Sequence, residues 1–437
     1  MKKAIVNVLK YIGIFVFMVA GLLALLTLTA KIPKASIKEN IVESLQFFKD
    51  NRGVELQKSR KEYKYLHCYA DSILLNMIYG IDTSKPLSSV LEAKYYETIR
   101  TDSNEDFIYS VENDLEVNQE YLRYWHGSTA ILRPLLVFFN VDQIYAINKV
   151  LLFLLAIVLF VMLFKRSIKL AIIYAISLVM ITFMYVPMCF EFTWTFYVMF
   201  ITSIIAILIE KRGNSGLYKL FFISGIVTCY LDFLSTETIT VLIPVVFVLY
   251  MRNKENRIKF KDAITFVVIS CALWLVAYAL MWVAKWLIAA AVLKIDVMQF
   301  VKEEFFEKFN GWDEGVTSAV MHKEVLLRNI KTLYPIHIMH PTMLTVVTWM
   351  TIAFLAIFTD WKNISKKWFA LIMVLISLVP YVRYFVLTFH SYYHSFFTFR
   401  AQIISIIGIG IAVLECLNYK LLFKDLKSKN KVKNIDK

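Results

Sequence analysis

The sequence lacks the short motifs that mark most nucleotide-dependent and redox enzymes. The patterns GxGxxG, GxxxxGKS/T, GxSxG and CxxC are all absent, so nothing in the chain indicates nucleotide hydrolysis or redox chemistry. Internal repeats and low-complexity tracts are absent too. Of only five cysteines, four lie in apolar runs, so no disulfide framework is implied.

Charged residues are scarce and apolar residues are abundant. Of the 437 residues, 59% are hydrophobic, 15% are aromatic and 19% are charged, and the mean hydropathy is +0.60. These values are typical of a membrane protein and exceed those of a soluble enzyme of this size. The formal net charge of +14 comes mostly from short loops between apolar runs and from the tail. Contact with membrane lipids explains this charge better than nucleic acid does, so nucleic acid is not an expected partner.

Lysine and arginine clusters follow the ends of the apolar runs and give an orientation. Cytoplasmic loops carry an excess of these residues, and about 20 apolar residues cross the ~30 Å hydrocarbon core. All clusters fall on one side if the chain crosses the cell membrane about ten times with both termini in the cytoplasm. The first run lacks a small-x-small cleavage site at its end, so we expect an uncleaved anchor. The predicted spans are 11–30, 146–164, 169–187, 189–209, 217–233, 237–251, 263–288, 342–359, 366–388 and 400–418.

Two segments on the outer side, 31–145 and 289–341, are too long to be turns. Helical or amphipathic patterns lie within them at 37–48, 68–79, 121–139 and 300–309, and the pattern at 121–139 favours a helix in the membrane interface. A basic cytoplasmic tail follows at 419–437. We therefore predict an all-α polytopic membrane protein, a single transmembrane domain over 1–437 with a long first extracytoplasmic loop.

Three residues of the first outer segment are candidates for chemistry. Asp71 lies in an apolar helical stretch, where a carboxylate is costly unless it is hydrogen-bonded or faces a cleft. It is therefore either a helix cap or a general base at the mouth of a cavity. His126 follows Tyr124 and Trp125 and is either a packed residue of an interfacial belt or a substrate contact. Arg133 is a fixed cation that can hold a lipid phosphate through two hydrogen bonds.

Two acids lie between the short fifth and sixth spans. Asp232 and Glu237 are placed near membrane depth, which is allowed only if this tip faces water or protein. We treat them as candidate substrate contacts and as the next acids in line for a base.

The richest patch lies between the last two spans and combines Arg383, His390, His394 and Arg400 with several tyrosines. The two histidines have metal-compatible spacing, but no acid lies between them as in HExxH metalloproteases, so zinc is not expected. The patch suits recognition of phosphate or pyrophosphate. The alternative is an interfacial aromatic belt with ordinary arginines.

The order of these features resembles the GT-C glycosyltransferases, which are polytopic enzymes that take sugar from a polyprenyl-phosphate carrier on the outer face. The similarity consists of one anchor span, a long first outer loop with an isolated acid, many further spans, a second large loop and a basic outer patch. The strings at 69–71, 124–136, 231–234 and 390–400 also resemble a group of uncharacterised polytopic proteins from Gram-positive bacteria.

The resemblance implies sugar transfer from a polyprenyl-phosphate donor to a cell-envelope acceptor. The acid of the first outer loop would be the catalytic base, and this role falls on Asp71. The base would remove a proton from an acceptor hydroxyl, whose oxygen attacks the anomeric carbon. The arginines and histidines named above would steady the departing lipid phosphate. A paired Asp-Asp or Glu-x-Asp is lacking at Asp71, so no cofactor is assigned and a divalent metal stays open.

Two other functions stay open. A transporter or flippase of a lipid-linked envelope precursor would also use a basic outer patch, although the chain does not show clear halves with matching broken spans. A non-catalytic scaffold or receptor is the third possibility. The substitution Asp71→Asn separates the first two, because an enzyme would lose activity while keeping its fold and a transporter need not.

Overall fold

The computed structural model describes residues 2–50, 69–98, 102–297, 299, 302, 316–333, 341–418 and 421. Within these ranges every regular element is helical, apart from two isolated β-bridges, Tyr95–Gln119 and Thr359–Leu417. The all-α class is therefore confirmed. The predicted helix at 300–309 and the tail at 419–437 lie outside the described residues, save for Lys302 and Leu421.

The helices follow the predicted apolar runs closely. They are α1 (Lys2–Ala30), α2 (Lys34–Asp50), α3 (Tyr69–Tyr79), α4 (Pro86–Glu92), α5 (Ser103–Glu112), α6 (Thr129–Leu135), α7 (Val141–Arg166), α8 (Ile168–Met180), η2 (Phe183–Met188), α9 (Phe190–Ile209), η3 (Glu210–Arg212), α10 (Asn214–Leu231), α11 (Ile239–Lys254), α12 (Phe260–Leu293), α14 (Ser318–Leu333), α15 (Pro341–Phe358), η4 (Trp361–Lys366), α16 (Trp368–Ser377), α17 (Val379–Val386), α18 (Thr388–Tyr393), α19 (Ser395–Thr398), η5 (Phe399–Gln402) and α20 (Ile403–Cys416).

Six helical stretches in the described residues are long and apolar enough to cross a membrane, as judged by length and composition. They are Val8–Ala30, Val141–Arg166, Phe190–Arg212, Phe260–Leu293, Trp368–Val386 and Ser395–Cys416. They support a multi-pass membrane protein. The other four predicted spans coincide with α8, α10, α11 and α15, so the count of ten crossings and the cytoplasmic termini stay predictions.

The chain forms two compact units. Unit 1 comprises Met1–Met162, Thr182–Val248 and Thr265–Lys308. Unit 2 comprises Leu163–Ile181, Leu249–Ile264 and Phe309–Lys437.

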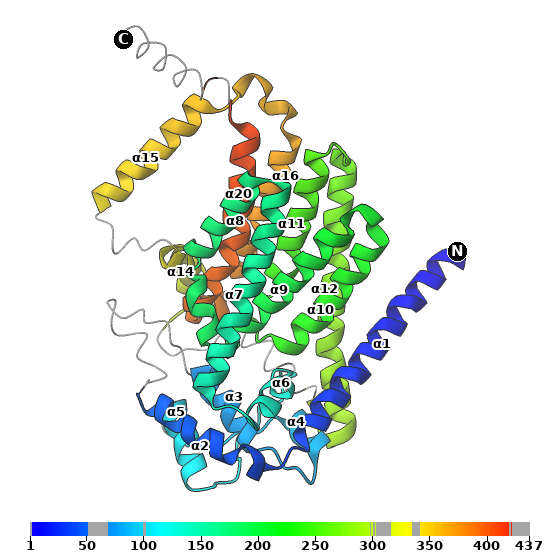
Figure 1. Cartoon of the computed structure of the whole chain (residues 1–437), viewed down its shortest axis with the longest axis vertical. Coiled ribbons are helices and arrows are strands. Elements are labelled where there is room, and N and C mark those ends of the chain that lie inside the picture. Colours follow the sequence, from blue (N-terminus) through cyan, green and yellow to red (C-terminus); the bar gives the residue numbers. More distant parts are fainter. Residues whose placement is uncertain are drawn as a thin grey trace. The chain divides into compact units, whose positions relative to one another are not determined.

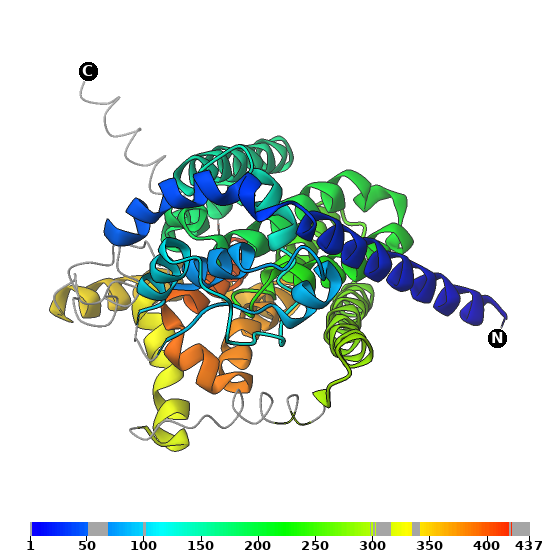
Figure 2. The same cartoon turned by 90° about the horizontal axis from the view of Figure 1, so that it is seen from below.

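In unit 1, the described part of the segment 31–145, the predicted first outer loop, folds into short helices at one end of the candidate spans. Figures 1 and 2 show α2 to α6 gathered where α7 begins and α12 ends. Helix α3 contacts α2, α5, α6 and the span α9. Helix α2 buries Ile37, Ile41, Leu45 and Phe48, whose spacing of three to four residues forms one apolar face. The helices predicted from the periodicity at 37–48 and 68–79 are confirmed as α2 and α3.

The interfacial helix predicted at 121–139 is shorter than expected. Only Thr129–Leu135 is helical, because His126 adopts a left-handed conformation with φ 51° and the chain turns there. Gly127 then approaches the end of α10 closely and donates its N–H to the Tyr230 carbonyl at 2.9 Å. A side chain at Gly127 would collide with the Tyr230 ring, so the turn requires glycine.

In unit 2, α16 packs along α20, and α14 packs on α17, α18 and α19. Gly408 on α20 lies against Ser377 on α16, which allows the two backbones to approach. The predicted span at 366–388 is interrupted after Ser377, because Pro380 has no N–H to continue the hydrogen-bond ladder of α16 and instead opens α17.

Candidate functional site

Asp71 joins the first outer segment to the start of the span α9. It lies in the first turn of α3, yet its side chain is fully buried. Its Oδ2 accepts hydrogen bonds from the Tyr145 hydroxyl at 2.5 Å and from the Phe190 N–H at 2.8 Å. Its Oδ1 accepts one from the Glu191 N–H at 3.3 Å and lies 3.6 Å from the Cys189 thiol. The first N–H groups of a helix have no acceptor within the helix, so Asp71 caps α9 from a distant part of the chain.

This geometry bears on the two interpretations of Asp71. Burial raises the pKa of Asp71 from 3.8 to about 6, although the hydrogen bonds from Tyr145 and the α9 backbone lower it. Such a pKa suits a general base, but a base must reach the proton that it removes. Both carboxylate oxygens are engaged and the side chain has no exposed surface. The contacts therefore favour the cap interpretation, although the cap is on α9 and not on the helix that carries Asp71.

Arg133 on α6 is also fully buried and binds backbone carbonyls. Its Nε and Nη2 donate to the Ile32 carbonyl at 3.2 and 2.5 Å, and its Nη1 donates to the Ile78 carbonyl. Ile32 follows the end of α1, and Ile78 lies in the last turn of α3, where carbonyls lack helical partners. Burial lowers the pKa of Arg133 to about 10, so the group stays charged at neutral pH. The expected contact with a lipid phosphate finds no support here, because these carbonyls occupy the guanidinium.

Lys285 is a third buried charge, which the sequence reasoning missed. Its ammonium donates to the Leu91 carbonyl at 2.7 Å in the last turn of α4, and it lies 6.0 Å from the centre of the Trp125 ring. The Trp125 indole donates to the Met281 carbonyl at 2.8 Å. A lone lysine in the apolar run of α12 was the signal available. We call Asp71, Arg133 and Lys285 the buried locks, because each joins separate segments of unit 1.

His126 is packed among aromatic rings. Its Nε2 lies 2.9 Å from the Tyr121 carbonyl, and its ring centre lies 4.8 Å from that of Tyr121 and 5.3 Å from that of Phe233. The pKa of His126 is lowered to about 3, mainly by burial and also by the charges of Lys285 and Arg123, although the hydrogen bond with the Tyr121 carbonyl raises it. The imidazole is therefore neutral, and the packed interpretation is favoured over a phosphate contact.

Asp232 and Glu237 are both buried, so the tip between α10 and α11 faces protein. The Asp232 Oδ1 accepts hydrogen bonds from the Ser235 N–H at 3.1 Å and from the Ser235 hydroxyl at 2.5 Å, which closes the turn. The Thr236 hydroxyl is 2.8 Å from that of Thr195 on α9. These contacts meet the condition under which acids are tolerated near membrane depth.

A small polar cavity lies on the first outer segment, between α3, α5 and the chain at 95–97. Its volume is about 40 Å³. We call it the outer pocket, and it is lined by Tyr69, Ile73, Asn76, Tyr95, Tyr96, Glu97, Ser103 and Asp106. The Asn76 amide fixes one wall, because it accepts from the Tyr96 N–H at 3.1 Å and donates to the Tyr96 carbonyl at 2.8 Å.

The two acids of the outer pocket have different surroundings. Asp106 is buried and accepts hydrogen bonds from the Thr98 N–H and hydroxyl. Glu97 is exposed, and its carboxylate accepts a hydrogen bond from the Tyr95 hydroxyl at 3.2 Å. Glu97 therefore offers an accessible carboxylate, whereas Asp106 holds the wall. Sequence reasoning missed this pocket, for which the string Tyr95-Tyr96-Glu97 was the available signal.

Tyr69 lines the outer pocket, and its phenol is near enough to Glu191, in the first turn of α9, to be affected by that charge. Its pKa is raised by burial first and then by Tyr121 and by the charges of Glu97 and Glu191, and it is lowered by the charge of Arg123. The charges of Glu97, Glu191 and Arg123, which come from different parts of the chain, thus all affect the pKa of Tyr69. Because Asp71 caps the first turn of α9, it also fixes the helical turn that carries Glu191.

The predicted arginine–histidine patch comes together in unit 2. The rings of His390 and His394 are 4.7 Å apart, so they do share a face. Both arginines are buried: Arg383 donates to the Ser391 hydroxyl at 3.3 Å, and Arg400 donates to the Phe396 carbonyl at 3.3 Å. These contacts, like those of Arg133, favour a structural role, and the contact with a phosphate stays a prediction.

Asn329 on α14 supports the patch. It donates to the Ser391 carbonyl at 3.0 Å and accepts from the Thr398 hydroxyl at 2.7 Å.

Within the described residues, no group of three or more histidine, cysteine, aspartate or glutamate side chains could hold a metal ion. Comparisons with protein families, with curated proteins and with solved structures found no match to this chain. The likeness to the GT-C glycosyltransferases therefore rests on the order of features in the sequence.

Proposed function

We propose that the protein is a membrane glycosyltransferase that moves a sugar from a polyprenyl-phosphate carrier to a cell-envelope acceptor on the outer face. The observation that carries this proposal is the chemistry of the outer pocket. Its three tyrosines, two carboxylates, amide and serine offer hydrogen-bond donors and acceptors suited to hydroxyl groups. A volume of about 40 Å³ accepts one hydroxyl group, since a water needs only about 10–15 Å³ of such space.

Glu97 is the residue that we assign as the base, in place of Asp71. It takes the proton of an acceptor hydroxyl, and the oxygen attacks the anomeric carbon of the donor sugar. The bond from that carbon to the phosphate oxygen breaks, and its electron pair leaves with the lipid phosphate. Asp71 keeps a positioning role, because it holds the first turn of α9 beside Tyr69.

The arginine–histidine patch of unit 2 supports a phosphorylated lipid as the donor. Arginine binds phosphate through charge-assisted hydrogen bonds, and two arginines and two histidines lie on one short stretch of chain here. The same feature favours the second candidate function, a transporter or flippase of a lipid-linked precursor, which needs phosphate contacts but no base.

The test measures sugar transfer by the reconstituted full-length protein from a panel of radiolabelled polyprenyl-phosphate hexoses. Glu97→Gln should lower the rate by about 10²-fold to 10⁴-fold, the usual effect of losing a general base. Glu105→Gln is the matched control, because Glu105 is an exposed acid on α5 that does not line the pocket. Both variants should unfold at the wild-type temperature.

Three outcomes would contradict parts of the proposal. Wild-type transfer by Glu97→Gln together with loss of transfer by Asp71→Asn, with the α9 amides still protected, would return the base role to Asp71. Wild-type transfer by both variants would remove the base from this segment. No transfer from any donor, with movement of lipid-linked sugar across the vesicle, would establish the transporter instead.

A further inference from the structure

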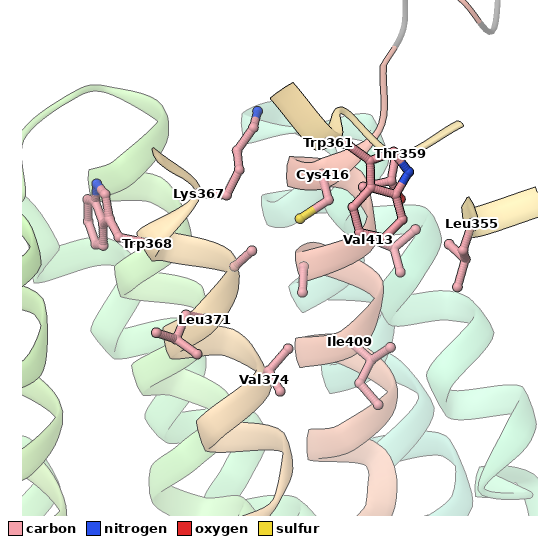
Figure 3. Close-up of a pocket in the computed structure, with 12 residues that line it drawn as sticks. Leu355, Thr359, Trp361, Lys367, Trp368, Leu371, Val374, Ile409, Val413 and Cys416 are labelled. Carbon is pink, nitrogen blue, oxygen red and sulfur yellow. The ribbon is translucent and has the colours of Figure 1, made fainter. Parts of the chain in front are cut away.

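Unit 2 contains an apolar groove between its helices. Its volume is about 550 Å³, which is within the ~300–1,000 Å³ range of ligand pockets. Figure 3 shows Leu371 and Val374 of α16 on one side of it and Ile409 and Val413 of α20 on the other. We call it the α16–α20 groove, and it is lined by Leu355, Thr359, Trp361, Lys367, Trp368, Ala370, Leu371, Val374, Ile409, Ala412, Val413 and Cys416.

The groove has one polar end. Lys367 and Trp361 lie at this end, and Trp368 begins α16 there, whereas Leu371 and Val374 further along α16 are aliphatic (Figure 3). Two backbone hydrogen bonds join the segment after α15 to the end of α20 here. The Asp360 N–H donates to the Cys416 carbonyl at 2.8 Å, and the Asn418 N–H donates to the Phe358 carbonyl at 2.7 Å. The polar end is therefore held by backbone bonds between the segments that follow α15 and α20.

The charge at the polar end is positive. The sequence Asp360–Lys367 holds three lysines and one acid. Lys169 on α8 and Glu415 on α20 are also near, since Lys367 and Lys169 both act on the Glu415 carboxylate. Tryptophan and lysine are the residues that membrane proteins place at the level of the lipid headgroups. The groove thus has an apolar body inside candidate membrane helices and a cationic mouth at their ends.

We infer that the α16–α20 groove binds an anionic phospholipid of the bilayer, with an acyl chain between α16 and α20 and the lipid phosphate at Lys367. The aliphatic lining from Leu371 to Val374 and from Ile409 to Val413 suits a hydrocarbon chain. Lys367 supplies the charge that distinguishes an anionic headgroup from a zwitterionic one. Basic pockets between transmembrane helices are known places for such headgroups, which gather in the cytoplasmic leaflet. Lys362–Lys367 belongs to that side in the predicted topology.

The experiment counts lipids retained by the full-length protein. The protein is placed in nanodiscs of phosphatidylglycerol and phosphatidylcholine, and native mass spectrometry measures the phosphatidylglycerol that stays bound. Lys367→Gln should lower this occupancy by about fivefold, equivalent to about 1 kcal/mol per basic residue. Leu371→Trp should lower it by filling the groove.

Each variant has a matched control. Lys362→Gln removes an exposed lysine that does not line the groove. Leu375→Trp adds the same ring one helical turn further along α16, at a residue that is 55% exposed, compared with 54% for Leu371, and that does not line the groove. Both controls should retain phosphatidylglycerol at the wild-type level.

Three results would overturn the inference. Equal occupancy in the wild type, Lys367→Gln and Leu371→Trp would show that the groove holds no lipid. Equal retention of phosphatidylcholine, unaffected by Lys367→Gln, would show an apolar chain without headgroup selection. Displacement of phosphatidylglycerol by equimolar polyprenyl phosphate would identify the groove as a carrier-lipid site instead.

Discussion

Replacing Asp71 with alanine should loosen the start of α9 by about 3 kcal/mol. The variant leaves three donors without their acceptor, namely the Tyr145 hydroxyl and the N–H groups of Phe190 and Glu191. A buried unsatisfied donor costs about 1–3 kcal/mol, so the three cost about 6 kcal/mol together. Removing the buried charge offsets about 3 kcal/mol of this, because the pKa of Asp71 is raised from 3.8 to about 6 and each unit is worth ~1.4 kcal/mol.

Hydrogen exchange at the first turn of α9 measures this effect directly. A loss of about 3 kcal/mol makes local opening about 100-fold more frequent, so peptides covering Phe190 and Glu191 should exchange on the order of 100-fold faster in Asp71→Ala. Asp71→Asn should restore most of the protection, because its amide oxygen still accepts from the helix. Unchanged exchange in Asp71→Ala would refute the cap and reopen the catalytic interpretation.

The pH dependence of the free energy of unfolding is a second, independent test of the burial of Asp71. The folded state holds the proton of Asp71 more tightly than the unfolded state does, because folding raises its pKa to about 6. The free energy of unfolding contributed by Asp71 should therefore fall by about 3 kcal/mol as the pH rises from about 4 to about 6, and stay level above that. The difference between the wild type and Asp71→Asn isolates this slope from that of other groups. A difference that does not vary with pH would show that burial does not control the ionisation.

Three further predictions concern the other locks, the topology and the lipid phosphate. Arg133→Lys should destabilise unit 1 by about 2–4 kcal/mol in thermal unfolding, because one ammonium cannot reach both the Ile32 and the Ile78 carbonyls. Wild-type stability of this variant would show that the two-sided contact of the guanidinium is not needed. Cysteines placed at the exposed positions Glu105 and Thr317 should react with impermeant thiol reagents added from outside, and cysteines placed at Asn214 and Asn363 should not. Labelling at Asn214 would reverse the predicted orientation. Arg400→Ala should weaken binding of polyprenyl phosphate by about tenfold to a hundredfold, since a charge-assisted contact contributes roughly 1.5–3 kcal/mol. Arg400→Lys should recover only part of the lost affinity. Equal affinity of the wild type and Arg400→Ala for polyprenyl phosphate would identify the patch as an interfacial belt.

Much of the helical layout could be predicted because it depends on local signals. Apolar runs of membrane length predicted the positions of α7, α9 and α12, and the three-to-four residue spacing predicted α2. The local departures from the predicted helices have local causes too. The break after Ser377 follows from Pro380, and the short α6 follows from the turn at His126. Both residues are visible in the sequence, but run length alone does not say whether a helix continues through them.

The roles of the candidate residues were harder to predict, for a physical reason. A catalytic acid and a structural acid give the same signature, which is one charge in apolar surroundings. Two of the partners of Asp71 are backbone N–H groups of α9, about 120 positions further along the chain, and a backbone amide leaves no mark in the sequence. The same holds for Arg133, whose acceptors are carbonyls. Sequence reasoning therefore found charges that matter to unit 1 and could not say what they bind.

The sign of each buried lock matches the helix end that it meets. Asp71 meets the N-terminus of α9, which carries partial positive charge, whereas Arg133 and Lys285 meet carbonyls at the C-terminal ends of α3 and α4, which carry partial negative charge. Such pairs orient the outer segment against the spans without a disulfide, and the four described cysteines are all free. These three side chains bind backbone groups, whereas Glu97 is an exposed carboxylate in the lining of the outer pocket. This difference in burial is the reason for proposing Glu97 as the base.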